Sequence, residues 1–223
     1  MKTTSTKDAL VKDKKGERTR GTIVGAARRV FSQHPYHTAS MRMIGKEAGV
    51  EHPLINYYFP TKARLFETIV KDICDEFIRL NEVWLDTVRE MKISDGFLKY
   101  IDMLLDFNDR NPEALRILAL NISQTENISQ IPGYQNFPGL IEGILKSFSE
   151  KLNVASNSSE LSMFVQSFNF QVISFLGASA CIAQVQGMNP GESRYRDWVR
   201  STLYFIFFPR LKEILVAARA SRN

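Results

Sequence analysis

The chain has 223 residues, 44% of them hydrophobic, with two cysteines and a formal net charge of +5. A chain of this length and composition builds one large or two small globular domains with an apolar core. Cys74 and Cys181 are too few for a disulfide framework. The N-terminus is polar, so we expect no secretory signal before the first domain and predict a cytoplasmic protein.

The charge is unevenly distributed along the chain. Residues 1–65 contain 13 Lys and Arg and 5 Asp and Glu, a net charge of +8, whereas the remaining residues carry a net charge of −3. A basic segment joined to a mildly acidic body suits binding to DNA phosphates. Within it, residues 1–16 predict a flexible basic tail, which is favoured over an arm that enters the minor groove.

The first predicted helix covers residues 17–33. Its apolar positions Ile23, Ala27, Val30 and Phe31 recur at helical spacing and form one buried stripe. His34 and His37 follow in a loop with no Cys or carboxylate nearby, so we predict exposed polar residues there and no metal site.

Residues 40–62 predict two short helices joined by a tight turn. Ser40 is a good N-cap, and Gly49 suits the left-handed position that ends a helix. Pro53 fits the first turn of a second helix, Pro60 ends it, and Thr61 caps a third.

The contact between these two helices is built from small residues. Gly45 and Ala48 allow close approach, and Ile44, Val50 and Ile55 supply a small core. This is the pattern of a helix-turn-helix, whose second helix enters the major groove of DNA. A helical hairpin inside an ordinary bundle is the alternative. The aromatic run, the Pro-Thr-Lys that follows and the basic helix upstream favour the DNA-binding interpretation.

Residues 18–70 resemble the DNA-binding domain of the TetR (tetracycline-repressor-like) family of bacterial transcription regulators. The positions that carry the resemblance are Ser40, Met41, Ile44, Ala48, Gly49, Val50, Ile55, Tyr58, Phe59, Thr61, Lys62 and Leu65. Three positions differ from the family pattern: Gly45 stands where Ala is usual, Glu51 where Ser or Thr is usual, and Asn56 where Tyr is common. The resemblance implies an all-α protein with an N-terminal three-helix helix-turn-helix domain, residues 17–65, and a C-terminal helical ligand-binding and dimerisation bundle, residues 66–223.

The remainder of the chain predicts further helices separated by polar loops. Their expected ranges are 61–91, 95–109, 112–122, 139–152, 160–187 and 192–220. The first continues out of the DNA-binding domain without a linker and connects the two domains. Pro209 should kink the last helix or split it near residue 206.

Residues 160–187 are apolar on most of the helix surface. Gln166, Asn169 and Gln184 argue against a membrane span, so more than one side of this helix must be covered by protein. Helices 160–187 and 192–220 look like the pair through which TetR-family proteins form homodimers, and the small residues 177–180 would allow close approach of two chains. A fully intramolecular core is the alternative.

Several residues of the helix-turn-helix are candidates for DNA contact. Ser40 and Thr61 stand at helix N-termini that can meet phosphates. Asn56 is suited to a paired contact with adenine, or is simply an exposed polar residue. Glu51 either repels phosphate or accepts from cytosine. The predicted DNA-binding residues are Ser40, Arg42, His52, Pro53, Leu54, Asn56, Tyr57, Tyr58, Thr61 and Lys62, with Arg18 and Arg20 as further backbone contacts.

The resemblance implies that the second domain binds a small-molecule effector, and its many aromatic residues without a fixed charge cluster predict an apolar one. An aromatic stripe at helical spacing is also typical of plain core. The candidate pocket residues are Phe97, Tyr100, Met103, Phe107, Phe137, Phe164, Phe168 and Phe175.

No catalytic residue, cofactor or metal site is predicted, because the chain has no nucleophile triad, phosphate loop or paired metal ligands. The resemblance to the TetR family implies a regulator, and we expect a repressor that binds a palindromic DNA operator as a homodimer and is released by a small molecule. The alternatives are an activator, a protein-interaction module that has lost DNA binding, and an enzyme built on a helical bundle.

Overall fold

The computed structural model describes residues 6–122 and 127–220, and every regular element in these two stretches is helical. The predicted all-α fold is therefore confirmed. The principal helices are α1 Thr6–Gln33, α2 Met41–Ala48, α3 His52–Tyr58, α4 Lys62–Val88, α5 Ile93–Arg110, α6 Pro112–Ile122, α7 Phe137–Leu152, α8 Ser159–Val172, α9 Ser179–Val185 and α10 Ser193–Ala220. Short 3-10 turns at Ile128–Gln130 and Tyr134–Asn136 precede α7, and a π-helical turn at Ile173–Gly177 separates α8 from α9.

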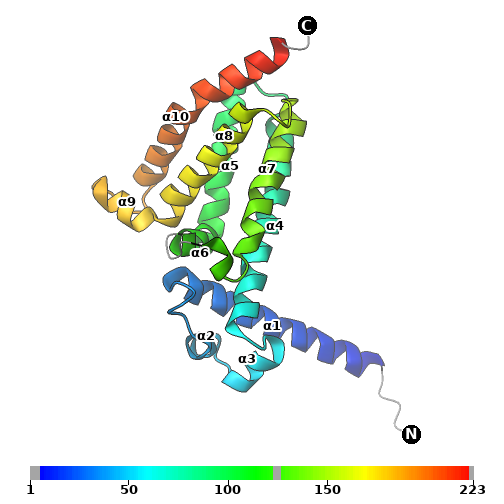
Figure 1. The fold of residues 1–223 in the computed structure, drawn as a ribbon. Coiled ribbons are helices and arrows are strands. Elements are labelled where there is room, and N and C mark those ends of the chain that lie inside the picture. The colour runs from blue at the N-terminus through cyan, green and yellow to red at the C-terminus, as the bar shows by residue number, and fades with distance from the viewer. Residues whose placement is uncertain (1–5, 123–126, 221–223) are drawn as a thin grey trace.

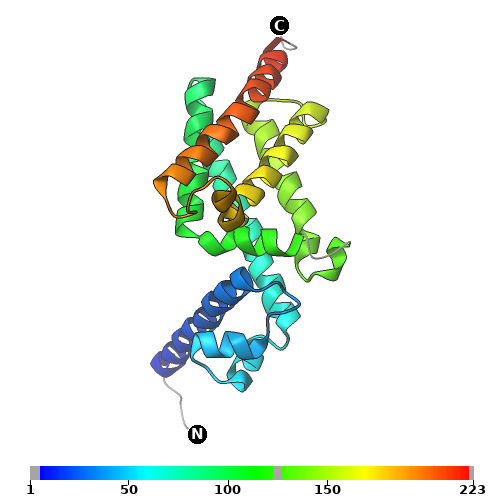
Figure 2. The same ribbon diagram turned by 90° about the vertical axis from the view of Figure 1, so that its left-hand side faces the viewer.

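The helices form two lobes joined by α4 (Figures 1 and 2). Helices α1–α3 make a three-helix unit around the fully buried side chains of Ile23, Phe31, Ile44 and Ile55. The start of α4 packs on this unit, and the rest of α4 continues into the bundle formed by α5–α10. The expectation of a continuous connecting helix without a linker is confirmed.

Helix α1 begins earlier than predicted. It runs from Thr6, whereas the sequence predicted a helix from residue 17 after a flexible tail. Residues 1–5 of that tail lie outside the described residues, and from Thr6 onward the prediction was wrong. Residues 6–16 contain Ala, Leu and four Lys, which are good helix formers, and no proline, so this segment can be helical without an apolar stripe.

The predicted single helix over 160–187 is broken. Helix α8 ends at Val172, and after the π-helical turn α9 leaves at an angle of 81°. A Cβ atom at Gly177 would lie 2.5 Å from the Cβ of Ala119 and the carbonyl oxygen of Leu115, both in α6. Gly177 thus packs closely against α6 within the chain, whereas Ala178 and Ala180 of the same predicted contact between chains are exposed.

Among the described residues, no single helix is both long and apolar enough to cross a membrane. The bent pair Ser159–Gly177 and Ser179–Val185 meets that criterion only when its two parts are taken together.

Helix α10 is continuous through Pro209. The predicted split near residue 206 is therefore absent. Proline lacks the N–H that would donate to the carbonyl of Phe205, and both residues lie on the exposed side of the helix, where water can solvate that carbonyl.

Candidate nucleic-acid interface and effector domain

The ends of α2 and α4 have the caps that the sequence predicted. The Ser40 hydroxyl accepts the backbone N–H of Met43 at 3.3 Å, and the Thr61 hydroxyl accepts that of Arg64 at 3.1 Å. Gly49 ends α2 with φ +65°, a left-handed conformation that disfavours a side chain.

Helix α3 has one buried and one exposed face. Ile55 is fully buried, and Phe59 directly after the helix is buried beside it. The other face exposes the side chains predicted to read DNA, with Tyr57 79% exposed. The structure brings these residues together on one surface: His52, Pro53, Leu54, Asn56 and Tyr57. Tyr58 is half-buried at the edge of this face. Val50 in the turn before α3 was expected to be buried and is half-buried.

Two polar residues of α3 contact each other across one helical turn. The Asn56 amide nitrogen lies 3.3 Å from Nδ1 of His52. With the imidazole proton on Nε2, the amide donates one hydrogen to Nδ1. Its second hydrogen and its carbonyl oxygen then remain free, which is the pair required to contact N7 and N6 of adenine. The contact therefore orients the amide without consuming the groups that would read a base.

Lys62 has a different environment from the one we predicted. Its ammonium group donates to the carbonyl oxygens of Tyr36 at 2.7 Å and Ala39 at 2.9 Å, and lies 4.4 Å from the centre of the Tyr36 ring. Burial lowers the pKa of this amine. An ammonium group with these partners is committed to the protein, so the predicted phosphate contact of Lys62 needs revision. Thr61, its neighbour, remains exposed.

Lys62 forms these hydrogen bonds with a segment between α1 and α2, residues 34–40, that we call the joint loop. From the other side, the Asn121 carbonyl of α6 accepts the backbone N–H of Tyr36 at 2.8 Å, and the Asn121 amide donates to the Ile117 carbonyl at 2.8 Å. Asn121 is fully buried. The joint loop, which ends at the N-cap of α2, is thus held by both α4 and α6. Sequence analysis missed this connection, because no local signal identifies a side chain that bonds backbone groups 85 positions away.

Positive charge is exposed around this lobe. Arg18, Arg20 and Arg42 are exposed, and the Arg20 guanidinium lies 5.2 Å from the centre of the Phe59 ring. Arg29 pairs with Glu47 across α1 and α2 at 2.6 Å, which secures the packing of these helices. Glu51 is exposed at the start of α3, and its side chain does not cap the helix.

The predicted pocket residues are mostly packed side chains of the bundle. Phe97, Tyr100, Phe164 and Phe168 contact one another with ring centres 5.8–6.3 Å apart. The other four lie elsewhere: Phe107 against Phe77 and Trp84, Phe137 against Tyr134, Phe175 against Trp198, and Met103 half-buried on α5.

A cavity of about 300 Å³ opens at the end of the bundle remote from the helix-turn-helix. Of the eight predicted residues it is lined only by Phe97 and Tyr100. Its other apolar walls come from positions that sequence analysis did not select: Leu85, Val88, Met91, Ile93, Phe148, Leu152, Leu211, Leu215 and Ala218.

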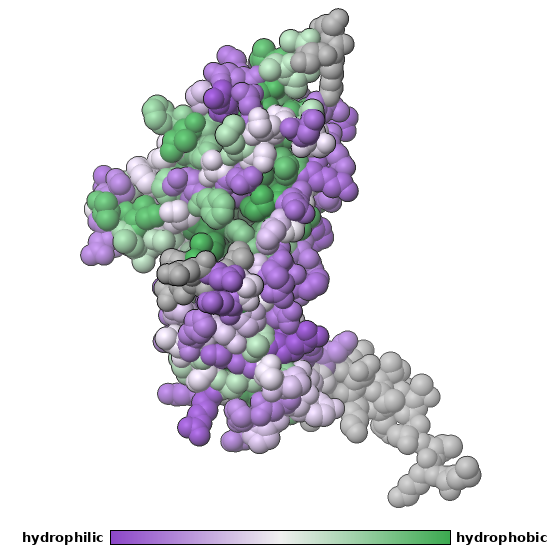
Figure 3. All heavy atoms as spheres, in the orientation of Figure 1, coloured by the Kyte–Doolittle hydropathy of each residue, from purple (hydrophilic) through white to green (hydrophobic). Residues whose placement is uncertain are grey.

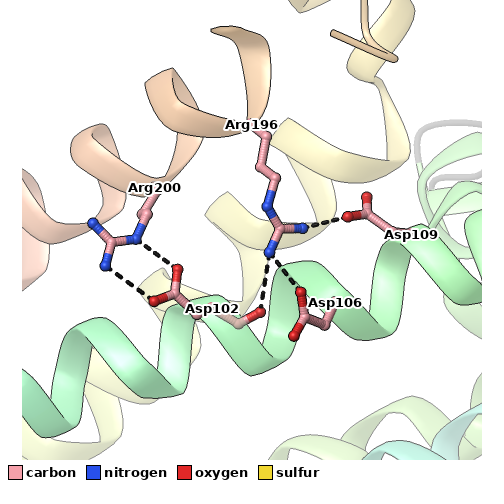
Figure 4. Close-up of polar contacts among 5 residues, drawn as sticks. All are labelled: Asp102, Asp106, Asp109, Arg196 and Arg200. Atoms are coloured by element: carbon pink, nitrogen blue, oxygen red, sulfur yellow. Dashed lines mark hydrogen bonds and ion pairs between the residues drawn. The ribbon is translucent and has the colours of Figure 1, made fainter. Parts of the chain in front are cut away.

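Ion pairs hold α10 on α5 (Figure 4). Arg200 forms two bonds with Asp102, at 2.6 and 3.0 Å, and this partner raises the pKa of its guanidinium. Arg196 pairs with Asp106 at 2.7 Å and also with Asp109. Paired, bidentate arginine contacts fix geometry as well as energy, so they set the orientation of α10.

That orientation leaves large apolar side chains exposed on α8 and α10. Phe205 is 81% exposed and Met163 60% exposed, and Phe170 and Ile206 are also exposed. Figure 3 shows hydrophobic residues gathered over the region of α8–α10, whereas the helix-turn-helix lobe is largely hydrophilic. An exposed apolar surface of this kind is typical of an interaction surface.

Comparison with known proteins identifies the N-terminal lobe. Residues 23–69 match the family described as bacterial regulatory proteins, tetR family. The chain is 27% identical over 126 residues to the HTH-type transcriptional regulator RutR of Escherichia coli K12, covering 55% of this chain and 54% of RutR. It is 38% identical over 69 residues to the HTH-type transcriptional regulator BetI of Vibrio vulnificus, covering 29% of this chain and 35% of BetI.

The chain spans about half the length of the first curated relatives it matches. The fold comparison extends further. A transcriptional regulator from Rhodococcus sp. Rha1 superposes with a TM-score of 0.63 at 15% identity, covering 89% of this chain and 96% of that one. At this identity the likeness concerns the fold of both lobes. The relatives are regulators and not enzymes.

Proposed function

The chain belongs to the TetR family of bacterial transcription regulators, and on this basis we propose that it represses transcription by binding a palindromic operator as a homodimer, which a small apolar ligand releases. In this proposal residues 17–65 are the DNA-binding domain and residues 66–223 bind the ligand and form the dimer. Members of the family bind DNA and small-molecule effectors, commonly as dimers.

The observation that carries the proposal is the exposed face of α3. The side chains of His52, Asn56 and Tyr57 stay in solvent and take no part in the core of the lobe. They lie next to the capped end of α2 and exposed arginines. An α-helix with this face fits the major groove, where Asn56 would read adenine and Pro53 and Leu54 would contact a thymine methyl.

Phosphate contacts would position that helix. The amide ends of α2 and α4, behind Ser40 and Thr61, are suited to anions, and Arg42 and Tyr58 stand beside them. In the revised assignment Lys62 holds the joint loop, so it acts on DNA binding through the position of Ser40.

Homodimer formation is supported by the apolar face of α8 and α10. Covering Met163, Phe205 and Ile206 with a second copy removes them from water, and the pairs of Arg196 and Arg200 keep α10 in place for that contact. Two copies would hold their recognition helices about one DNA turn, roughly 34–36 Å, apart.

Release by ligand requires a path from the bundle to the helix-turn-helix. Helix α4 supplies one, since Lys62 at its start bonds the joint loop, and Asn121 of α6 supplies a second. A ligand that favours one arrangement of α4 and α6 over another changes the position of α2 and α3, which is the physical requirement for allostery.

We would test the proposal by selecting bound DNA from a random duplex pool. The most enriched sequence is then titrated with protein at several salt concentrations. We expect a palindromic consensus whose affinity falls steeply with salt, because binding releases counterions from phosphates. Asn56→Ala should relax the preference at one base pair in each half-site. Arg42→Gln should weaken all sequences alike and reduce the salt slope by about 2, because each of the two copies loses one phosphate contact.

A folded dimer that enriches no sequence would refute DNA binding and favour an interaction module. That alternative draws on Glu51, an exposed acid at the start of α3 that phosphates would repel. Glu51→Ser separates the two explanations, because it should strengthen DNA binding only if α3 approaches DNA.

A further inference from the structure

The cavity at the remote end of the bundle is built from four helices. Its walls come from the ends of α4, α7 and α10 and from the start of α5, the end of the molecule opposite the helix-turn-helix in Figures 1 and 2. Along α4, Val88 in this cavity and Lys62 at the joint loop are separated by roughly 39 Å, at about 1.5 Å per residue. The site therefore touches both the helix that reaches the DNA-binding lobe and the helix of the proposed dimer surface.

The interior of the cavity is apolar. Leu85, Phe97, Phe148 and Leu215 are buried side chains that line it. Tyr100 is the polar residue of the inner wall, but its hydroxyl already donates to the Asn81 carbonyl at 2.7 Å. A ligand thus meets hydrocarbon and aromatic surface inside, and the buried part of a ligand must be apolar.

The rim carries an excess of positive charge. Lys151 pairs with Asp86 at 2.8 Å, and Arg89 lies 3.4 Å from Glu90. Arg219, also on the rim, has no ion-pair partner among the described residues. Among the residues that the structure describes at this rim, three cations stand against two carboxylates when the Asp86 partner of Lys151 is counted, which leaves one unit of positive charge at Arg219.

One electrostatic contribution disfavours binding of an anion at this rim. Helices α4, α7 and α10 end here, and their terminal carbonyls carry partial negative charge. These charges are fractional and screened by solvent, whereas a guanidinium carries a full charge and two parallel N–H donors that match a carboxylate. The guanidinium should therefore decide the preference, and this balance can be measured directly.

We propose that this cavity binds an aliphatic carboxylic acid of roughly ten heavy atoms, with its chain among Leu85, Phe97 and Leu215 and its carboxylate at Arg219. The size follows from the volume, because 300 Å³ corresponds to about ten water volumes of roughly 30 Å³ each. Release of an operator by this ligand rests on the proposed function, whereas binding itself does not.

Intrinsic fluorescence provides the assay. The protein has two tryptophans, and Trp84 lies 5.9 Å from the ring of Tyr100 in the cavity wall. In a Trp198→Phe background Trp84 is the sole reporter, so octanoate, octanol and octylamine can be titrated separately in the absence of DNA. We expect octanoate to bind at least tenfold more tightly than either of the other two at about pH 8, where the acid is ionised and the amine protonated.

Two variants and a matched control locate the interaction. Arg219→Gln should remove the advantage of octanoate over octanol, while Arg116→Gln, the same change at an exposed arginine of α6 outside the cavity, should leave it intact. Ala218→Leu adds bulk to the cavity wall and should weaken octanoate and octanol together.

Several outcomes would overturn the assignment: no response of Trp84, equal binding of octanoate and octanol, tighter binding of octylamine, or an Arg219→Gln protein that still prefers the acid. Adding octanoate to an operator complex separates this proposal from the function. Binding of octanoate without loss of the operator supports the site and refutes regulation through it. If the protein binds the operator but does not bind octanoate, the proposed ligand site is refuted and the proposed repressor function is unaffected.

Discussion

Replacing Lys62 by methionine tests whether this residue holds the joint loop or touches DNA. Methionine keeps most of the aliphatic stem and removes the ammonium group. The structure assigns to that group two short bonds, to the carbonyls of Tyr36 at 2.7 Å and Ala39 at 2.9 Å. Because the site is half-exposed, each charge-assisted bond is counted at about 1 kcal/mol. The free energy of unfolding should fall by about 2 kcal/mol, which lowers Tm by roughly 4–8 °C in a chain of this size.

DNA binding then distinguishes the two roles. A lysine that neutralises a phosphate contributes about 0.9 to the slope of log K against log salt concentration. If Lys62 acts through the joint loop, Lys62→Met should weaken binding to the operator by about tenfold at every salt concentration and leave that slope unchanged. Arg42→Met is the matched control. Arg42 is exposed, so its loss from both copies of the dimer should reduce the slope by about 1.8, about 0.9 for each copy, and change stability by less than about 0.5 kcal/mol.

A reversed pattern would refute the reasoning. If Lys62→Met reduced the salt slope like Arg42→Met and left Tm unchanged, the ammonium group would be bound to phosphate in the complex. The bonds to the joint loop would then contribute little to folding, and the prediction from sequence would be restored.

Three further predictions concern the bundle. Phe205→Arg places a charge on the exposed apolar face of α10 and should yield folded monomers in sedimentation; a persistent dimer would rule out this surface as the interface. Gly177→Val puts a side chain 2.5 Å from α6 and should lower stability by about 3 kcal/mol in thermal unfolding, whereas Gly139→Ala, which meets open space, should be neutral or stabilising. Burial raises the pKa of Cys74 to about 12, so thiolate becomes abundant only as pH approaches that value. A thiol reagent at neutral pH should therefore label the exposed Cys181 first and Cys74 only after unfolding, and rapid labelling of Cys74 in the folded protein would contradict its burial.

The parts of the fold that follow from sequence are those decided within one or two helical turns. The caps at Ser40 and Thr61 and the left-handed Gly49 bond backbone groups a few positions away, so residue type and spacing suffice to predict them. The exposed face of α3 follows in the same way, once Ile55 is identified as the buried position.

Features that depend on contacts between distant segments were not predictable in this way. At the break after α8, Gly177 packs directly on α6, and nothing near residue 177 signals that partner. Arg200 and Asp102 are each unremarkable on their own helices and become a fixed pair only when α10 lies on α5 (Figure 4). The cavity likewise depends on how four helix ends converge, which a one-dimensional aromatic pattern does not encode.

The energies at the joint loop bear on how a repressor of this construction would respond to a ligand. A hundredfold loss of operator affinity corresponds to a coupling free energy of about 2.7 kcal/mol. The Lys62 bonds contribute about 2 kcal/mol and the Asn121 bond to Tyr36 about 1 kcal/mol, so together they are of the required size. A ligand that shifts only α4 would break only the first set and would release the operator partially. Full release requires α6 to move as well, and Gly177 ties α6 to the turn between α8 and α9. Coupling should therefore depend on the bundle moving as a unit, with α4 and α6 as its two attachments to the DNA-binding lobe.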